Sequence, residues 1–227
     1  MVTEYLPLIF SFIIASTYYY ANGIKIKNKP YYQKILSFTS GVSITYVLLE
    51  LFPAFTEVAL NITKFLFVTI LLGFIIHHII EKEIYKHNRN HELMKLLSLE
   101  ENVFSFIYHI ILGIILVTLY KGDPVDGVLA FIPILTFTLA STLPMASHLT
   151  KKKALFMSSS TIIGSSLALL WRTIPIELEF SLIGLATGVL LYTVIRHQIP
   201  FGRGGRIGYF TMGFTIYALF IIITWYI

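Results

Sequence analysis

Four ionisable side chains lie inside or near the ends of apolar segments of this sequence: Glu50, His109, His148 and His197. An ionisable group at membrane depth is costly, so it usually faces a cavity or a charged partner. Imidazole and carboxylate groups bind divalent metals and carry protons. Because cysteine is absent, thiolate metal sites and disulfides are excluded. Any metal chemistry must therefore use His, Asp and Glu side chains together with hydroxyl or backbone oxygens.

Two of the histidines fall at similar depth in consecutive antiparallel segments. His109 and His148, with hydroxyls from Ser141, Thr142 or Ser147, form a set that could bind zinc. The anionic ligands expected for tight divalent binding are missing from this set. The alternative is a neutral histidine hydrogen-bonded between helices without metal, and we favour it for both residues.

The spacing of nucleophiles, bases and acids indicates no catalytic arrangement. Ser158 to Ser160 have no histidine and aspartate at a spacing typical of a hydrolase triad. The glycines beside Arg203 follow no strand and precede no P-loop lysine, so they do not predict a phosphate site. We predict that the protein is not an enzyme and holds no cofactor.

Composition indicates which elements carry these residues. Of 227 residues, 56% are hydrophobic and 13% charged, with a mean hydropathy of +0.77, which lies outside the range of soluble domains. A helix needs about 20 apolar residues to cross a bilayer, and such stretches recur along the whole chain. We predict one all-α integral membrane domain, 1–227, with eight spans, at about 4–22, 35–57, 63–81, 103–120, 127–149, 154–172, 179–199 and 207–227.

Basic residues alternate between the connections. The first, third, fifth and seventh connections hold fourteen of the 17 Lys and Arg residues, and the others hold only Lys64, Lys121 and Arg172. Because Lys and Arg accumulate in cytoplasmic loops, both termini are predicted outside the cytoplasm of a multi-pass cell-membrane protein. The alternation also explains the net charge of +5 without a nucleic-acid partner. The long connection, 81–102, is predicted to form an amphipathic helix at the lipid surface.

Two segments of the sequence align without gaps. Gly41 to Pro53 reads GVSITYVLLELFP, and Gly188 to Pro200 reads GVLLYTVIRHQIP. Their offset of 147 residues crosses five predicted spans, so the copies point in opposite directions, as in inverted-repeat transporters. This predicts a 3+2+3 arrangement, with repeats at about 4–81 and 154–227 around a central pair at 103–149. The alternative is coincidence, since Gly and Pro are common in transmembrane helices.

Glu50 and His197 occupy the same position in the two copies, nine residues after the glycine. They would form a proton or cation relay, or they would lie near helix ends and extend to the headgroup region, and the sequence favours neither. A further cluster, His77, His78 and Glu81, lies at the predicted cytoplasmic end of the third span. We interpret the histidines as interfacial residues in contact with water rather than as part of a cytoplasmic metal-release or sensing site.

The two aligned segments resemble the second and seventh spans of the Zrt/Irt-like (ZIP) metal transporters. The second span of that family has a Gly, then a His nine residues on, and then Leu-Leu-Pro, and its seventh has Gly-x-x-Leu-Tyr and an acidic residue before Leu-Pro. The matching residues here are Gly41, Pro53, Gly188, Leu191, Tyr192 and Pro200. Eight spans, external termini and a longer loop after the third span are also similar to that family, so the resemblance covers the whole chain.

The metal-binding motifs of the family are mostly missing. The family has His-Asn-x-x-Asp in the fourth span, where this chain has only His109, and His-Glu-x-Pro-His-Glu in the fifth, where Pro144 has no matching ligand around it. An alternative alignment places the fourth-span motif at Asp123 to Gly127, too close to Pro144 for two separate helices. Glu50 and His197 exchange the family's histidine and acid.

The resemblance implies a transporter that moves a cation, plausibly a divalent metal such as zinc, iron or manganese, by rocking one bundle against another. The rival hypothesis is a ZIP-like membrane protein without a metal site, acting as a binding or structural subunit or handling another small solute. Membrane lipid is the predicted environment under both. Transporters of this kind commonly form dimers, and no segment specifies an interface for a homodimer.

Overall fold

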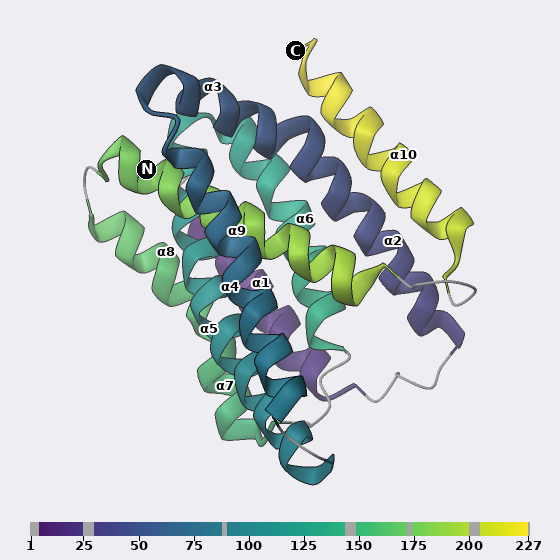
Figure 1. Cartoon of the computed structure of the whole chain (residues 1–227). Helices are drawn as coiled ribbons and strands as arrows, with labels where there is room; N and C mark the ends of the chain where they lie inside the picture. Colours follow the sequence, from purple (N-terminus) through teal and green to yellow (C-terminus); the bar gives the residue numbers. More distant parts are fainter. Residues whose placement is uncertain are drawn as a thin grey trace.

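The computed structural model describes residues 5–24, 30–87, 90–143, 149–171, 174–199 and 205–226, and every regular element among them is helical (Figure 1). Two short segments, η2 and η3, are π-helical. The elements are α1 Leu6–Asn22, α2 Pro30–Tyr46, η2 Val47–Leu51, α3 Phe52–Ile62, α4 Leu66–His87, α5 Asn90–Gly122, α6 Pro124–Thr142, α7 Lys151–Ser158, α8 Ser160–Leu170, α9 Ile176–Thr193, η3 Val194–Gln198 and α10 Ile207–Thr224.

Six of the helical stretches are long and apolar enough to cross a membrane. They are Tyr31–Ile62, Asn102–Gly122, Pro124–Thr142, Lys151–Leu170, Ile176–Arg196 and Ile207–Thr224. The other two predicted spans are also helices: α1 has 17 residues, and α4 has 22 but carries Glu81, Lys82 and Glu83 toward its end. The all-helical prediction and the multi-pass character are confirmed, with six candidate spans of the eight predicted.

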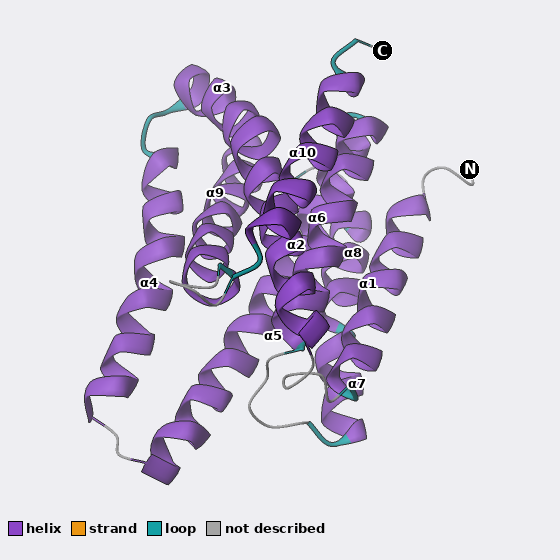
Figure 2. Ribbon diagram, turned by 90° about the vertical axis from the view of Figure 1, so that its right-hand side faces the viewer, coloured by secondary structure: helices purple, strands orange, loops and turns teal. Residues whose placement is uncertain are grey.

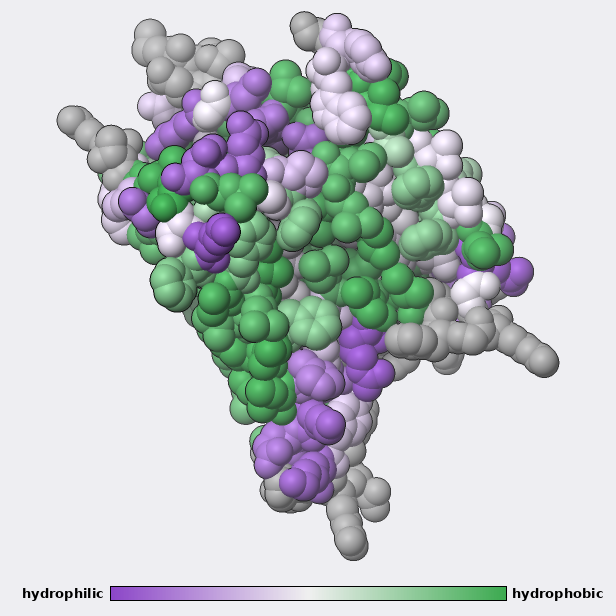
Figure 3. Space-filling model, turned by 45° about the horizontal axis from the view of Figure 1, so that its top comes forward, coloured by the Kyte–Doolittle hydropathy of each residue, from purple (hydrophilic) through white to green (hydrophobic). Residues whose placement is uncertain are grey.

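The outer surface of the bundle is that of a protein in lipid. Figure 3 shows apolar side chains covering the middle of one face, with hydrophilic side chains gathered toward its ends. Helix α10 exposes large apolar side chains on most of its circumference, including Phe214, Ile216, Leu219 and Ile223. A soluble monomer rarely exposes a continuous apolar surface of this extent, so lipid is the matching solvent.

The long connection after the third predicted span does not form a separate surface helix. Helix α4 extends to His87, and α5 begins at Asn90 and continues without interruption to Gly122. The prediction of an independent amphipathic helix at 81–102 is therefore wrong. The charged residues of this stretch instead lengthen two antiparallel helices beyond their apolar parts, because the helical pattern of each has no proline or glycine to stop it.

Glycines set the closest helix contacts. A Cβ atom on Gly41 of α2 would lie 2.3 Å from the carbonyl oxygen of Phe210 in α10, and one on Gly188 of α9 would lie 2.1 Å from that of Ile70 in α4. The reverse contacts also use glycine: a Cβ atom on Gly213 would lie 2.2 Å from the carbonyl oxygen of Phe38, and one on Gly73 would lie 2.2 Å from that of Leu185. The pairs α2 with α10 and α4 with α9 therefore pack backbone against backbone.

These contacts recur at constant offsets in the chain. Gly41 and Gly188 are 147 residues apart, as are Phe38 and Leu185, whereas their partners Phe210 and Ile70 are 140 apart, as are Gly213 and Gly73. The π-helical segments η2 and η3 also begin 147 residues apart. A constant offset over several independent contacts is not expected from chance occurrences of glycine.

Each π-helical segment ends two residues before a proline, Pro53 after η2 and Pro200 after η3. The N–H of Phe52 bonds the carbonyl of Val47, and the N–H of Ile199 bonds that of Val194, so the bonds span five residues instead of four. Proline has no N–H, and its ring clashes with the carbonyl four residues earlier, which favours the wider turn. The copies then differ: α3 continues for eleven residues after η2, whereas Ile199 is extended after η3.

The helices form one bundle around a shared apolar core. Residues from α1, α2, α5, α6, α9 and α10 contribute, including Ile14, Val42, Leu116, Phe137, Ile183 and Ile221. Helix α1 begins and α10 ends at one end of the bundle, whereas α4 ends and α5 begins at the opposite end (Figure 2). We refer to these as the terminal end and the α4–α5 end.

Candidate functional site

His109 lies at the contact between α5 and α6 and is 1% exposed. Its Nε2 atom is 3.0 Å from Oγ1 of Thr138, and its Nδ1 atom is 2.7 Å from the carbonyl oxygen of Ser105. Both ring nitrogens are therefore engaged with oxygen atoms of the protein. A metal ion would have to displace one of these contacts, so the geometry matches the prediction of a histidine hydrogen-bonded between helices.

The hydroxyls proposed to assist His109 are also used within α6. Ser141 and Thr142 both donate to the carbonyl oxygen of Thr138, at 3.2 and 2.7 Å. These are bonds to the preceding turn of the same helix, which Ser and Thr commonly form in apolar surroundings. His148 and Ser147 lie outside the described residues.

Glu50 lies in η2, at the terminal end of the bundle. Its Oε2 atom is buried without a hydrogen-bond partner. The negative charge of Asp126, in the first turn of α6, interacts with the Glu50 carboxylate, and the side chain of Trp225 at the end of α10 contacts it. Two half-buried carboxylates at one end of a membrane bundle would favour a cation or proton there.

His197 occupies in η3 the place that Glu50 occupies in η2, each being the fourth residue of its segment. Its side chain lies outside the described part of the structure, so the predicted pairing with Glu50 stays a prediction. π-helical turns are frequent at functional sites because they re-aim side chains and loosen backbone hydrogen bonds.

The predicted metal residues do not gather into one site within the described part of the chain. No three His, Asp or Glu side chains among the described residues come close enough to hold a metal ion. His109 is engaged with α6, whereas Glu50 lies beside Asp126 at the terminal end. Four residues were predicted to bind metal: Glu50, His109, His148 and His197. Only the side chains of Glu50 and His109 are described, and these two have different partners.

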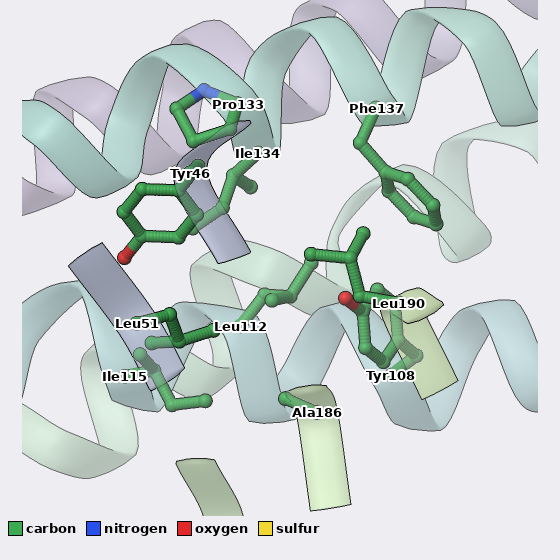
Figure 4. A pocket seen from close by; sticks show the side chains of 10 residues that line it. All are labelled: Tyr46, Leu51, Tyr108, Leu112, Ile115, Pro133, Ile134, Phe137, Ala186 and Leu190. Carbon is green, nitrogen blue, oxygen red and sulfur yellow. The ribbon is translucent and has the colours of Figure 1, made fainter. Parts of the chain in front are cut away.

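A small apolar cavity occupies the centre of the bundle, between α2, α5, α6 and α9 (Figure 4). Its volume of about 20 Å³ has room for about one water molecule. Apart from two tyrosines, its walls are apolar: Tyr46, Leu51, Tyr108, Leu112, Ile115, Pro133, Ile134, Phe137, Ala186 and Leu190. The hydroxyl of Tyr108 is buried without a hydrogen-bond partner. This centre offers no ligand set for a divalent metal.

A second polar cluster lies toward the α4–α5 end. Tyr192 donates a hydrogen bond to Oε2 of Glu81, and Nη2 of Arg196 lies 3.5 Å from Oε1 of the same carboxylate. Glu81 is only 4% exposed. The interpretation that the histidines here meet water fits His78, which is exposed, but not His77, whose side chain is only 12% exposed because it packs against Phe104 and Tyr192.

A proline inside α6 creates a further polar contact that the sequence reasoning missed. Pro133 has no N–H to bond the carbonyl of Leu129, four residues earlier, and the hydroxyl of Tyr217 in α10 donates to that carbonyl instead. The signal was present in the sequence as a proline in the middle of an apolar span. Its partner was not, because nothing local places α10 against α6.

Comparisons with known proteins identify no relative of this chain: no family model, no curated protein and no solved structure matches it.

Proposed function

We propose that this chain is a membrane transporter with eight spans in a ZIP-like 3+2+3 inverted-repeat bundle, and that it moves a cation. In this proposal α1 and α4 cross the membrane together with the six longer apolar stretches. Both termini lie outside the cytoplasm of the cell membrane, as the distribution of Lys and Arg predicts. The whole chain is one domain.

The observation that carries the proposal is the repetition of contacts at constant offsets. The Gly41 and Gly188 contacts, together with η2 and η3, relate α2 to α9 and α4 to α10. A fold with two oppositely oriented copies has two nearly equivalent conformations, which is the basis of alternating access. Each helix and its copy are five spans apart. Because five is an odd number, the two copies run in opposite directions across the membrane, which supports transport over a static role.

Cation transport is favoured by the charge of the buried groups at the terminal end. Glu50 and Asp126 place two carboxylates beside each other, and Glu50 occupies one of the two π-helical segments. A divalent metal such as zinc, iron or manganese is the first cargo to test, because the resemblance to ZIP proteins implies it. In this proposal the metal is the transported substrate and not a cofactor that stays bound.

The test is ion uptake into liposomes that contain the purified protein. Zinc, cadmium, iron and manganese would each be followed with an internal indicator, and protons with an internal pH dye. Glu50→Gln keeps the volume and removes the charge, and is expected to abolish saturable uptake. Glu57→Gln is the matched control, because Glu57 is an exposed carboxylate on the same span. Uptake unaffected by Glu50→Gln would contradict the proposed pathway.

A second candidate is supported by a specific observation. Both nitrogens of His109 are engaged, and the central cavity is apolar, so the bundle resembles a transporter from which the metal site has been lost. Such a protein would act as a binding or structural subunit, or handle another small solute. Well-folded protein that takes up none of the four metals and no protons would support this candidate over cation transport.

A further inference from the structure

The α4–α5 end of the bundle is held together by a pair of titratable side chains. Nε2 of His77 in α4 lies 3.5 Å from Oε1 of Glu100 in α5, and the two side chains are only 12% and 7% exposed. The imidazole ring also stacks on Phe104 of α5, with ring centres 4.8 Å apart and planes 27° from parallel. The imidazole of His77 therefore lies against α5 through both a charged group and an aromatic ring.

The other groups that face His77 come from its own helix and from α9. The ring of Tyr192 in α9 lies 4.8 Å from the ring of His77. Through its hydroxyl, Tyr192 connects to Glu81, which Arg196 approaches, while Nδ1 of His78 lies 3.4 Å from that hydroxyl. Among the interactions that the described residues show, the titratable and charged neighbours are Glu100 from α5, Tyr192 from α9, Arg196 from η3, and His78 and Glu81 from α4.

The protonation state of His77 decides the strength of its contact with Glu100. Histidine is the side chain whose ordinary titration falls between pH 5 and 8. When His77 is protonated, it forms a charge-assisted contact with a carboxylate that is nearly excluded from water, and such contacts are stronger than neutral ones. When His77 is neutral, the charge attraction is lost while the carboxylate stays buried.

The two ends of the bundle show a related arrangement with one chemical difference. The offset of 140 that relates α4 to α10 places His77 in correspondence with Tyr217. His109 of α5 and Thr138 of α6 are 29 residues apart, and the same offset makes Glu100 of α5 correspond to Leu129 of α6. Tyr217 does donate to the carbonyl of Leu129, so α10 meets α6 where α4 meets α5. Of these two contacts, only the one between α4 and α5 pairs an imidazole with a carboxylate.

We propose that His77 is a proton-binding site, and that binding a proton there closes α4 against α5 at the α4–α5 end of the bundle. The proposal rests on the proposed transport function, because opening and closing at alternate ends is what a transporter of this kind requires. Its new content is the ligand, a single proton, and the residue pair that binds it. Low pH on that side would then hold this end closed.

The sign follows from linkage. The closed state binds the proton more tightly because the Glu100 carboxylate lies beside His77. Closure is therefore favoured at low pH, and the advantage disappears as the pH rises through the range in which the closed state releases its proton. A single linked proton changes the equilibrium by at most about tenfold per pH unit.

The absence of cysteine allows a direct test by labelling a single introduced thiol. Leu190 lines the central cavity and lies two residues before Tyr192. Labelling of Leu190→Cys therefore reports whether a reagent can reach the central cavity past His77 and Tyr192. Protein in lipid nanodiscs would be labelled with a charged maleimide at about pH 5.5 and about pH 8. Each rate would be divided by the rate for the same variant unfolded in detergent at that pH, which removes the titration of the thiol itself.

The expected result is that normalised labelling is about tenfold slower at the lower pH. Adding His77→Gln should remove this difference, and Glu100→Gln should reduce it. Lys82→Gln is the control, because Lys82 is an exposed charged residue of the same helix and should preserve the difference. All variants would be compared by gel filtration and circular dichroism, so that an unfolded variant is recognised and Glu100→Gln can replace His77→Gln.

Three outcomes would overturn the proposal: the same pH dependence with His77→Gln and Glu100→Gln, its loss with Lys82→Gln, or no labelling of folded protein at any pH. The labelling requires no transported ion. Protein that shows pH-dependent labelling but no ion uptake would retain the proton site and refute transport. Protein that transports a cation but labels independently of pH would retain the proposed function and refute the proton site.

Discussion

His109 and Thr138 meet at the centre of the bundle, where Nε2 of His109 lies 3.0 Å from Oγ1 of Thr138. Their neighbours Tyr108 and Phe137 also meet, with ring centres 5.4 Å apart. Each pair is separated by 29 residues, so α5 and α6 contact each other through corresponding positions. Such self-matching contacts are expected where a two-fold axis passes between two related helices. His109 therefore connects the two helices of the central pair.

This position predicts a stabilising role for His109 that needs no metal. His109→Ala should lower the free energy of unfolding by about 2 kcal/mol, because it removes an interhelical hydrogen bond and leaves a cavity. Thr138→Val removes only the hydroxyl and should cost about 1 kcal/mol. Unfolding in mixed micelles with increasing SDS, followed by circular dichroism in EDTA, measures both. A His109→Ala protein that is unchanged in EDTA but no longer stabilised by zinc would indicate a metal ligand instead.

The glycine contacts predict matched losses in the two halves of the chain. Gly41→Ala and Gly188→Ala should each destabilise the protein by about 1–3 kcal/mol, because the new Cβ atom would lie against a backbone oxygen at 2.3 and 2.1 Å. The same SDS titration would measure the effect.

Gly208→Ala is the control for the glycine series, since nothing lies within 4 Å of a Cβ atom there. Its stability should stay within about 0.5 kcal/mol of the unchanged protein. Equal stability of all three variants would show that the close approach of α2 to α10 and of α4 to α9 is not required.

Much of this fold is readable from the sequence, because membrane spans are set by the length of apolar stretches. The correspondence of Gly41 and Gly188 was also visible in the sequence as an ungapped alignment. In the structure each of these glycines lies at a close contact between two helices. The π-helical segments were not predicted: a proline indicates a disturbed helix, but not whether the backbone kinks or widens. The length of α5 was missed because charged residues stop an apolar stretch without stopping a helix.

The eight-span topology predicts which loops face each side of the membrane. Single cysteines at Lys64 and Lys121 should react with an impermeant reagent added outside cells, whereas cysteines at Lys82 and Lys152 should react only after the cells are opened. The cysteine-free chain provides the background. The comparison of Lys64 with Lys82 tests α4 directly, because Lys64 precedes this helix and Lys82 follows its apolar part. Reaction of both from the same side would mean that α4 does not cross.

The candidate site was less predictable than the fold. Glu50 and His109 were found because a charged or titratable residue is conspicuous in an apolar span, but their partners come from other helices. The same limit applies to Glu81, which is buried and accepts a hydrogen bond from Tyr192 of α9. A residue's type shows the chemistry it can do, whereas its partner depends on packing between helices: Thr138 is 29 residues from His109, and Tyr192 is 111 residues from Glu81.

The contact between Tyr217 and the carbonyl of Leu129 predicts a measurable coupling with Pro133. Tyr217→Phe should cost about 1–2 kcal/mol, because it leaves a buried carbonyl with neither a helical nor a phenolic donor. Pro133→Ala restores an N–H that can bond Leu129 within α6. In that background Tyr217→Phe should therefore cost less, by about 0.5–1 kcal/mol. A double-mutant cycle with SDS unfolding measures the difference, and additive losses would show that the tyrosine does not replace the missing helical bond.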